Sequence, residues 1–339
     1  MKTVDVLIPT YKPGKEFVKL LALLRKQTVT VHKIIIMNTE ELYFDRFLYQ
    51  YPKCFQNIPV EVHHLPESEF DHGGTRHRGM LYSTSDICVC MTQDAVPYDE
   101  HLLEKLIAPL ARADVAVAYA RQLAKEDAGP LEQFSRSFNY PPVSRAKTRA
   151  DIETMGIKAF FCSDVCAAYN REIYLKLGGF IRHTIFNEDM IFAAKALKAG
   201  YCVYYAAEAK VVHSHEYGFM QQLHRNFDLG VSQADHPEVF AGISSEKEGK
   251  KMVQSACKYF LQQKKPFEIL HLVTQSGAKY LGYFLGKHYQ KLPVSLRHSL
   301  TTNQAYWQQH RRKAEQAKID PKYGYGQSAV EKTDRQRGE

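Results

Sequence analysis

The chain has 339 residues, 45% of them hydrophobic, which is enough to bury the core of one α/β domain with an appendage. No run approaches the roughly 20 apolar residues that a membrane-spanning helix needs, and the first five residues lead into a strand without room for a signal peptide. Most of the seven cysteines lie in apolar runs and none forms a CxxC pair, which is typical of reduced core residues. We therefore expect a cytoplasmic protein.

The positive charge is concentrated at the C-terminal end. Residues 247–339 hold 18 Lys and Arg against 7 Asp and Glu, whereas residues 1–246 hold 27 against 30. The overall charge of +8 is therefore a property of the C-terminal region. Nucleic acid, anionic lipid or an acidic protein would each suit such a surface.

Strand and helix patterns alternate over the first 120 residues. We expect strands at residues 4–9, 32–37, 59–64, 86–91 and 115–120, and helices between them. This alternation predicts an α/β fold with a doubly wound, mostly parallel sheet flanked by helices. GxGxxG and GxxxxGK[ST] are both missing, so the dinucleotide and P-loop interpretations lose their main support.

The second half of the chain is less regular. Residues 122–156 are expected to form a long, mobile loop near the site, followed by ordered structure from residue 160. Asn187 is predicted to cap a helix that stops before Gly200, and short strands follow at residues 201–206 and 210–212. The predicted units are residues 1–243, with halves of about 1–121 and 122–243, a basic helical region at 244–317, and a polar tail at 318–339.

The stretch that organises the chain is Asp86–Pro97. A buried apolar run ends there in Thr92-Gln93-Asp94, so Asp94 is expected at the carboxyl end of a central strand, where open α/β sheets bind ligands. Its carboxylate suits the divalent cation of a nucleoside diphosphate. The alternative is an aspartate that begins a turn before Pro97.

Three further groups carry candidate chemistry. Residues 71–79, DHGGTRHRG, open a helix, and their glycines and Arg76 favour a phosphate site over a simple turn. In Asn187-Glu188-Asp189, Asp189 is either a general base or an acidic residue that complements the helix dipole. His213 and His215 share one face of a strand end, either as metal ligands beside Asp94 or as structural histidines.

In this order, the motifs VDVLIPTY, TQDA, NEDM and HSH resemble a glycosyltransferase of family 2 with the GT-A fold. The stretches FDHGGTRHRG, GIKAFFCSDVCAAY, LGGF, IFNEDMIFAAK and RNFDLGVS are similar to bacterial rhamnosyltransferases that build cell-wall or capsular rhamnan and O-antigen. The resemblance covers residues 4–248 and implies dTDP-β-L-rhamnose as donor and a lipid-linked saccharide as acceptor, joined in an α-L-rhamnosidic bond.

The resemblance also implies roles for individual residues. Asp189 would be the base, Asp94 with His213 or His215 would hold Mg²⁺ or Mn²⁺, and Glu188 and Asn187 would lie on the acceptor side. The residues implied in donor binding are Thr10, Tyr11, Asn38, Thr39, Asp71, Gly74, Arg76, Gln93 and Asp94.

Two positions depart from the family pattern. Thr92 replaces the first acid of the usual Asp-x-Asp, so water is expected in part of the metal shell. His77 stands where Asn is expected, which is predicted to alter the pocket.

Residues 266–292 combine apolar side chains with lysines at 279, 287 and 291, and Lys264 and Lys265 directly precede them. One interpretation is an interfacial helix on the anionic inner face of the cell membrane, and the other is core packing or a homodimer seam. Nucleic acid is not expected as a partner, because no zinc, RRM or helix-turn-helix signature accompanies the basic region.

Other functions also remain open from the sequence. A UDP-sugar could be the donor, or the protein could bind sugar nucleotides or glycans without catalysis. A nucleotidyltransferase would normally show a glycine-rich, lysine-bearing loop, for which only Lys12-Pro13-Gly14-Lys15 is present.

Overall fold

A computed structural model describes residues 2–243 and 246–309, so the expected polar tail at 318–339, and residues 310–317 of the expected helical region, lie outside it. The described residues form a nine-stranded sheet in the order β3-β2-β1-β4-β8-β6-β9-β5, with β7 paired to β9. The strands are β1 (Val4–Tyr11), β2 (Lys33–Thr39), β3 (Val60–Leu65), β4 (Ile87–Met91), β5 (Val96–Pro97), β6 (Val115–Leu123), β7 (Arg145–Lys147), β8 (Cys166–Asn170) and β9 (Cys202–Val212).

The sheet is mixed, with six long strands in one direction. β1, β2, β3, β4, β6 and β9 run parallel, whereas β8 runs antiparallel to both of its neighbours, β4 and β6. The short strands β5 and β7 also run antiparallel to β9. The expected α/β architecture is confirmed, and the reversed strand β8 is the feature that the alternation did not predict.

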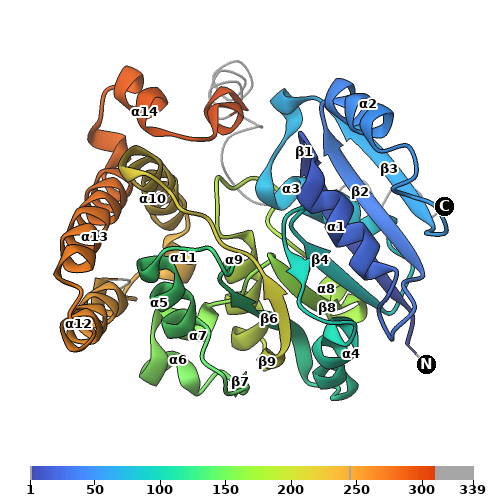
Figure 1. Ribbon diagram of the computed structural model, residues 1–339, viewed down its shortest axis with the longest axis horizontal. Helices are drawn as coiled ribbons and strands as arrows, with labels where there is room; N and C mark the ends of the chain where they lie inside the picture. Colours follow the sequence, from blue (N-terminus) through green and yellow to red (C-terminus); the bar gives the residue numbers. More distant parts are fainter. Residues whose placement is uncertain (1, 244–245, 310–339) are drawn as a thin grey trace, which may run out of the picture.

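Helices cover both faces of the sheet, and more helices follow it in the chain (Figure 1). Those of the α/β part are α1 (Lys15–Leu24), α2 (Glu41–Gln50), α3 (His72–Tyr82), α4 (Leu102–Ile107), α5 (Pro130–Asn139), α6 (Asp151–Met155), α7 (Ile157–Phe160), α8 (Arg171–Lys176), α9 (Glu188–Lys198), and the 3₁₀ turns η1 (Glu67–Glu69) and η2 (Ala108–Ala111). Those that follow are α10 (Phe219–Asp235), α11 (Pro237–Phe240), α12 (Glu246–Gln262), α13 (Pro266–Lys287), η3 (Tyr289–Lys291) and α14 (Val294–Leu300).

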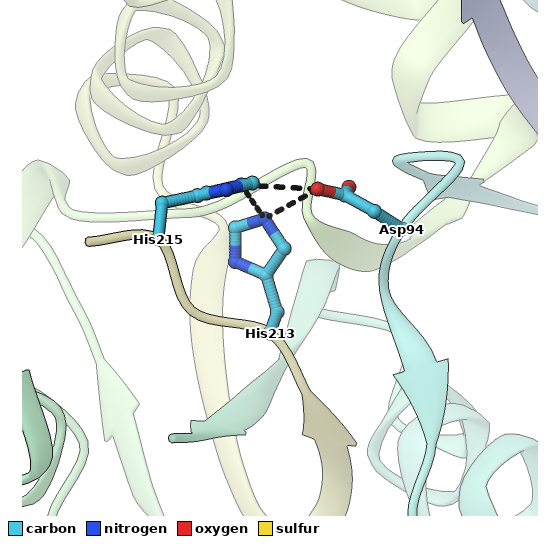
Figure 2. A group of neighbouring side chains, drawn as sticks. All are labelled: Asp94, His213 and His215. Carbon is cyan, nitrogen blue, oxygen red and sulfur yellow. Dashed lines mark hydrogen bonds and ion pairs between the residues drawn. The ribbon is translucent and has the colours of Figure 1, made fainter. Parts of the chain in front are cut away.

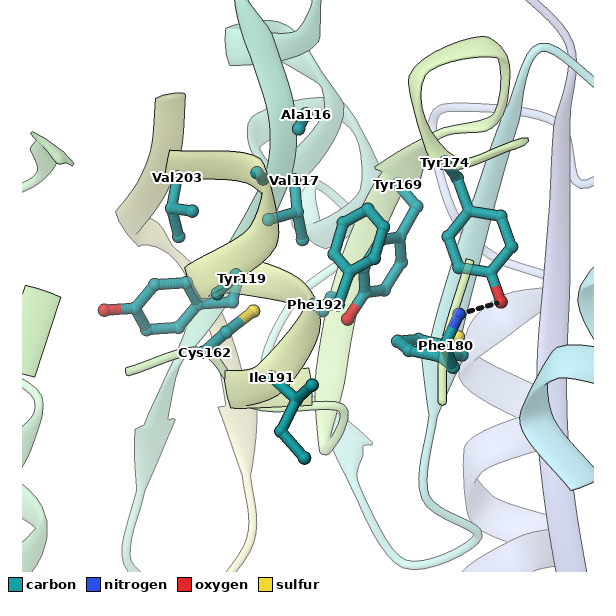
Figure 3. Packing of buried hydrophobic residues seen from close by; sticks show 14 of the residues in the cluster. Ala116, Val117, Tyr119, Cys162, Tyr169, Tyr174, Phe180, Ile191, Phe192 and Val203 are labelled. Atoms are coloured by element: carbon teal, nitrogen blue, oxygen red, sulfur yellow. Dashed lines mark hydrogen bonds between the residues drawn. The ribbon is translucent and has the colours of Figure 1, made fainter. Parts of the chain in front are cut away.

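Alternating side chains of the strands fill two cores. In β1, Leu7 joins one core, whereas Val6 and Ile8 join the other, because successive side chains of a strand point to opposite faces. The first core contains a cluster of aromatic rings from β8, α8 and α9 (Figure 3). Within it, the Tyr174 hydroxyl accepts a hydrogen bond from the Phe180 N–H at 3.0 Å, so its polar end is satisfied.

The region expected to be a mobile loop, residues 122–156, is ordered. It contains α5, β7 and α6, and Lys147 of β7 is 2% exposed. The Lys147 ammonium donates to the carbonyl oxygens of Phe161 and Lys158. The expectation failed because the packing comes from residues distant in sequence, which a local pattern does not show.

Helices α10 and α13 pack with their backbones in close contact. A Cβ added at Gly282 would overlap the Leu223 carbonyl, and one at Gly286 would overlap the Phe227 carbonyl. Gly230 of α10 faces the Tyr283 carbonyl in the same way. The three glycines therefore fix how α13 lies against α10.

We expect Gly282→Ala to lower the free energy of unfolding by about 1–3 kcal/mol, since a backbone carbonyl cannot move aside as a side chain can. Gly277 is the matched control, because it lies in the same helix and nothing lies within 4 Å of an added Cβ. Gly277→Ala should be neutral or stabilise by up to about 1 kcal/mol. Urea denaturation measures both, and equal stability of the two variants would contradict the close packing.

Candidate active site

The candidate site lies at the carboxyl edge of the six parallel strands. A cavity of about 440 Å³ there is lined by Asp94, which follows β4, by Asp189 at the start of α9, and by His213 and His215, which follow β9. Because β8 is antiparallel, its amino end reaches the same edge, and the preceding Asp164 lines the cavity too. The structure thus brings together residues from four separate parts of the sequence.

Asp94, His213 and His215 form a compact group with metal-ligand chemistry (Figure 2). The Asp94 Oδ2 atom lies 3.0 Å from His215 Nε2 and 3.6 Å from His213 Nε2. One ligand atom from each residue lies within 4.8 Å of the others. Burial raises the pKa of the Asp94 carboxyl, but the hydrogen bonds from the two imidazoles outweigh it, so the pKa is lowered and the group is a carboxylate.

Gln122 of β6 orients the buried imidazole of this group. Its Oε1 lies 3.1 Å from His213 Nδ1. An amide oxygen only accepts, so Nδ1 carries a proton, and once Nε2 gives up the proton that it shares with Asp94 its lone pair is free to hold a cation. The Gln122 amide nitrogen donates to Ser163 Oγ at 2.9 Å, which fixes the orientation of the Gln122 side chain. Asp94, His213 and His215 therefore fit a divalent cation, and no sequence pattern pointed to Gln122.

Asp189 is the carboxylate across the cavity. Its Oδ2 accepts a hydrogen bond from the Asp164 N–H at 3.1 Å, and its Oδ1 accepts one from the Met190 N–H at 2.7 Å. Burial raises the pKa of Asp189, and the nearby negative charges of Glu188 and Asp164 raise it further. A carboxylate with a raised pKa is a stronger base than an exposed one.

Arg76 of α3 lies between two buried acids beside Asp189. Its Nη1 is 2.9 Å from Glu188 Oε1, and its Nε is 3.5 Å from Asp164 Oδ2. Burial raises the pKa of Asp164 to about 7, which Glu188 reinforces and Arg76 opposes. The guanidinium thus belongs to an acidic cluster at the cavity wall, and its expected contact with a donor diphosphate stays a prediction.

The residues implied in nucleotide binding gather one strand further along the edge. Thr10 of β1 pairs with Asn38 of β2, and the Thr10 Oγ1 donates to Asn38 Oδ1 at 3.0 Å. The next residues of the two strands, Tyr11 and Thr39, also pair with each other. Gln93 accepts from the Tyr11 N–H at 3.1 Å and donates to its carbonyl at 2.9 Å. Their roles stay predictions, but they are close together.

The glycines at the start of α3 have a packing role. The Ile181 and Arg182 carbonyls occupy the space where a Cβ at Gly73 or Gly74 would lie, which explains the glycines by packing, and the expected approach of a phosphate to the backbone there stays a prediction. Asp71 caps the helix by accepting from the Gly74 N–H at 2.6 Å, and it also accepts from the Thr184 N–H at 3.1 Å. A contact between Asp71 and a donor stays a prediction.

Asn187 begins α9, but its side chain does not cap the helix as expected. Its φ of 67° is left-handed, a region that Asn tolerates. The side-chain amide donates instead to Ser232 Oγ of α10 at 3.1 Å. Asn187 and Glu188 both line the cavity, so their acceptor-side role remains a prediction.

The two departures from the family pattern have different outcomes. His77 is buried and does not line the cavity, because its Nδ1 lies 2.9 Å from the Tyr174 hydroxyl in the core, so the expected change to the pocket is wrong. Thr92 lines the cavity, and its buried hydroxyl has no hydrogen-bond partner among the described residues.

Comparisons with known proteins agree with this geometry. Residues 5–178 match the family model described as glycosyl transferase family 2. The O-antigen chain rhamnosyltransferase RfbN of Salmonella typhimurium is 36% identical over 308 residues, which are 90% of this chain and 96% of the relative. The chain belongs to glycosyltransferase family 2. WbaN of Salmonella anatum, also named an O-antigen chain rhamnosyltransferase, is 36% identical over 312 residues, 91% of this chain and 96% of the relative.

Solved structures support the GT-A fold of this glycosyltransferase. The mannosyltransferase PcManGT from Pyrobaculum calidifontis, in complex with GDP-Man and Mn²⁺, aligns with a TM-score of 0.51 and 15% identity over 95% of this chain and 82% of its own. S. aureus TarS 1–349 in complex with UDP-GlcNAc gives 0.50 and 12%, over 85% and 91%. Because the chain belongs to family 2 and matches two O-antigen rhamnosyltransferases over most of its length, the enzyme acts on a nucleotide-sugar donor and a saccharide acceptor.

We expect Asp189→Asn to lower kcat by about 10²–10⁴-fold, because the amide keeps the shape but cannot take a proton. Affinity for a nucleoside diphosphate, measured by calorimetry, should stay within about twofold. Glu172→Gln is the control, since it removes an exposed acid from the first turn of α8.

The pH profile provides a second readout. A base with a raised pKa loses activity as the pH falls through that pKa, so the acidic limb should lie above the ordinary Asp value of about 4. Full activity of Asp189→Asn would remove Asp189 from the chemistry.

Proposed function

We propose that this glycosyltransferase moves L-rhamnose from dTDP-β-L-rhamnose to a hydroxyl group of a saccharide acceptor, with inversion to an α-L-rhamnoside, in the synthesis of O-antigen or a related cell-surface polysaccharide. Similarity to two O-antigen rhamnosyltransferases over 96% of their lengths supports the sugar and the pathway class. The acceptor we propose is lipid-linked.

The observation that carries the catalytic part is the shared cavity. Asp94, His213 and His215 line one part of it, and Asp189 lines the other. A displacement at the anomeric carbon needs charge neutralisation at the leaving diphosphate and a base near the attacking hydroxyl. A non-catalytic binding protein has no need of a buried carboxylate with a raised pKa.

In this proposal the residues divide the reaction between them. Asp189 accepts the proton of the acceptor hydroxyl, and the N–H groups of Asp164 and Met190 hold its carboxylate in place. Asp94, His213 and His215 would hold Mg²⁺ or Mn²⁺, which when bound would supply positive charge to the diphosphate. Gln122 keeps His213 in the tautomer that can act as a ligand.

Measuring donor hydrolysis and transfer across a panel of sugar nucleotides tests the proposal. We expect dTDP-rhamnose to be preferred by at least about tenfold over UDP- and GDP-sugars, and EDTA to abolish activity until Mg²⁺ or Mn²⁺ is restored. Preference for a UDP-sugar would change the donor but keep the class. Equal activity with EDTA would remove the proposed metal.

The membrane location of the acceptor suggests a role for α13. No described helix has the length and apolar character needed to cross a bilayer. However, α13 exposes Phe267 (85%), Leu270 (65%) and Val273 (55%), and Lys264 and Lys265 lie immediately before the helix. We propose that this face attaches peripherally to anionic lipid on the inner side of the cell membrane, by apolar insertion and cationic attraction.

Vesicle sedimentation tests this attachment. Wild-type protein should sediment with phosphatidylglycerol vesicles and much less with phosphatidylcholine. Phe267→Ser with Leu270→Ser should reduce binding at least about tenfold, whereas Leu42→Ser, which changes an exposed leucine of α2, should not. Unchanged binding by the double variant, or a dimer that dissociates when this face is changed, would favour the homodimer interpretation instead.

A further inference from the structure

A second cavity opens from the active site toward the C-terminal helices. Its volume is about 270 Å³, and its wall comes from α5, α10 and α13. Phe186, His215 and Tyr217 line both this cavity and the active-site cavity, and so do Arg136, Arg225 and Leu229. A group bound here would therefore lie beside the candidate metal ligands. We refer to this second cavity as the helix cavity.

The helix cavity is positively charged. It is lined by Arg136 of α5, Arg225 of α10 and Lys279 of α13, and by only one acid, Glu132, among the described residues. Glu132 is already paired with Arg136 at 2.7 Å. Neither Arg225 nor Lys279 has a carboxylate within ion-pair distance in the part of the chain that is described. Two cations are thus left without a counter-ion.

In the interfacial-helix interpretation, Lys279 would meet lipid together with the neighbouring lysines, but the structure places it elsewhere. Lys279 is partly buried in the helix cavity. Burial lowers its pKa, and the positive charges of Arg136 and Arg225 lower it further, against the opposing effect of Glu132. An anion placed among these residues would remove that repulsion.

The positions of the two unpaired cations are fixed by packing. The Arg225 guanidinium lies over the Phe186 ring, with its Cζ 4.7 Å from the ring centroid. Lys279 precedes Gly282 by one helical turn, and Gly282 packs directly on the Leu223 backbone, two residues before Arg225. The glycine contacts between α10 and α13 therefore hold Arg225 and Lys279 on one wall.

We propose that Arg225 and Lys279, with Arg136, bind a phosphate group in the helix cavity. A guanidinium and an ammonium without carboxylate partners match the oxygens of a phosphate or diphosphate. The phosphate comes either from the diphosphate of the donor or from a phosphate that links the saccharide acceptor to its carrier. The second source rests on the proposed function, whereas the site itself does not.

Binding of inorganic pyrophosphate to the whole protein, measured by calorimetry in EDTA, tests the site without turnover or metal. Arg225→Gln and Lys279→Gln should each weaken binding roughly tenfold, the scale of a lost charge-assisted hydrogen bond. Lys287→Gln removes an exposed charge from the same helix, so it should stay within about twofold of wild type. Arg225→Lys keeps the charge but loses the planar guanidinium, so it should weaken binding less than Arg225→Gln does. No wild-type binding, or equal affinities of all four variants, would overturn the proposal.

Steady-state kinetics with the preferred donor distinguish the two sources. Two acceptors with the same saccharide are compared, one an alkyl glycoside and one an alkyl diphosphate conjugate. If the acceptor supplies the phosphate, Arg225→Gln raises KM about tenfold for the diphosphate conjugate alone. If the donor supplies it, the variant weakens nucleoside diphosphate binding and affects both acceptors equally. A donor panel that rejects dTDP-rhamnose would refute the proposed sugar but leave the pyrophosphate result standing.

Discussion

The candidate active site depends on the ion pairs that the buried guanidinium of Arg76 makes with Glu188 and Asp164. Glu188, Asp164 and Asp189 would otherwise place three acids around one cavity wall, and like charges at such distances strongly oppose ionisation. One fixed positive charge offsets part of that repulsion, while the remaining imbalance keeps the pKa of Asp189 raised. Removing one member of such a buried network leaves the others uncompensated, so these residues act as a unit.

The reversed strand β8 explains how this cluster forms. In a sheet of purely parallel strands, only the residues that follow each strand reach the carboxyl edge. An antiparallel strand also places the residues that precede it at this edge. Asp164 lies there because it comes two residues before Cys166, which pairs with Met91 at the carboxyl end of β4. Its backbone N–H then positions Asp189, which comes from a helix 25 residues later in the chain. The helix pair α10 and α13 lines the adjoining helix cavity with cations, so the C-terminal helices border the active-site cavity.

Local patterns were sufficient for the elements with strong periodicity. The apolar runs of β1, β2, β3, β4 and β6 appear within a few residues of their expected positions, because buried strands need uninterrupted hydrophobic side chains. The same reasoning failed for residues 122–156, where short elements are held by contacts such as Lys147 with Phe161. Nothing in the local sequence distinguishes such a segment from a loop.

The sequence by itself determined the chemical types at the site, because Asp94, His213, His215 and Asp189 stand at strand and helix ends where polar groups are recognisable against apolar runs. Only the tertiary structure decided which of them meet, and what surrounds them. In the structure, Gln122 accepts the Nδ1 proton of His213, and Arg76 lies among acids. Lys279 lines a cavity and does not lie on a lipid-facing surface. Those outcomes depend on distances between residues far apart in the chain, which follow from strand order and helix packing and leave no trace in local spacing.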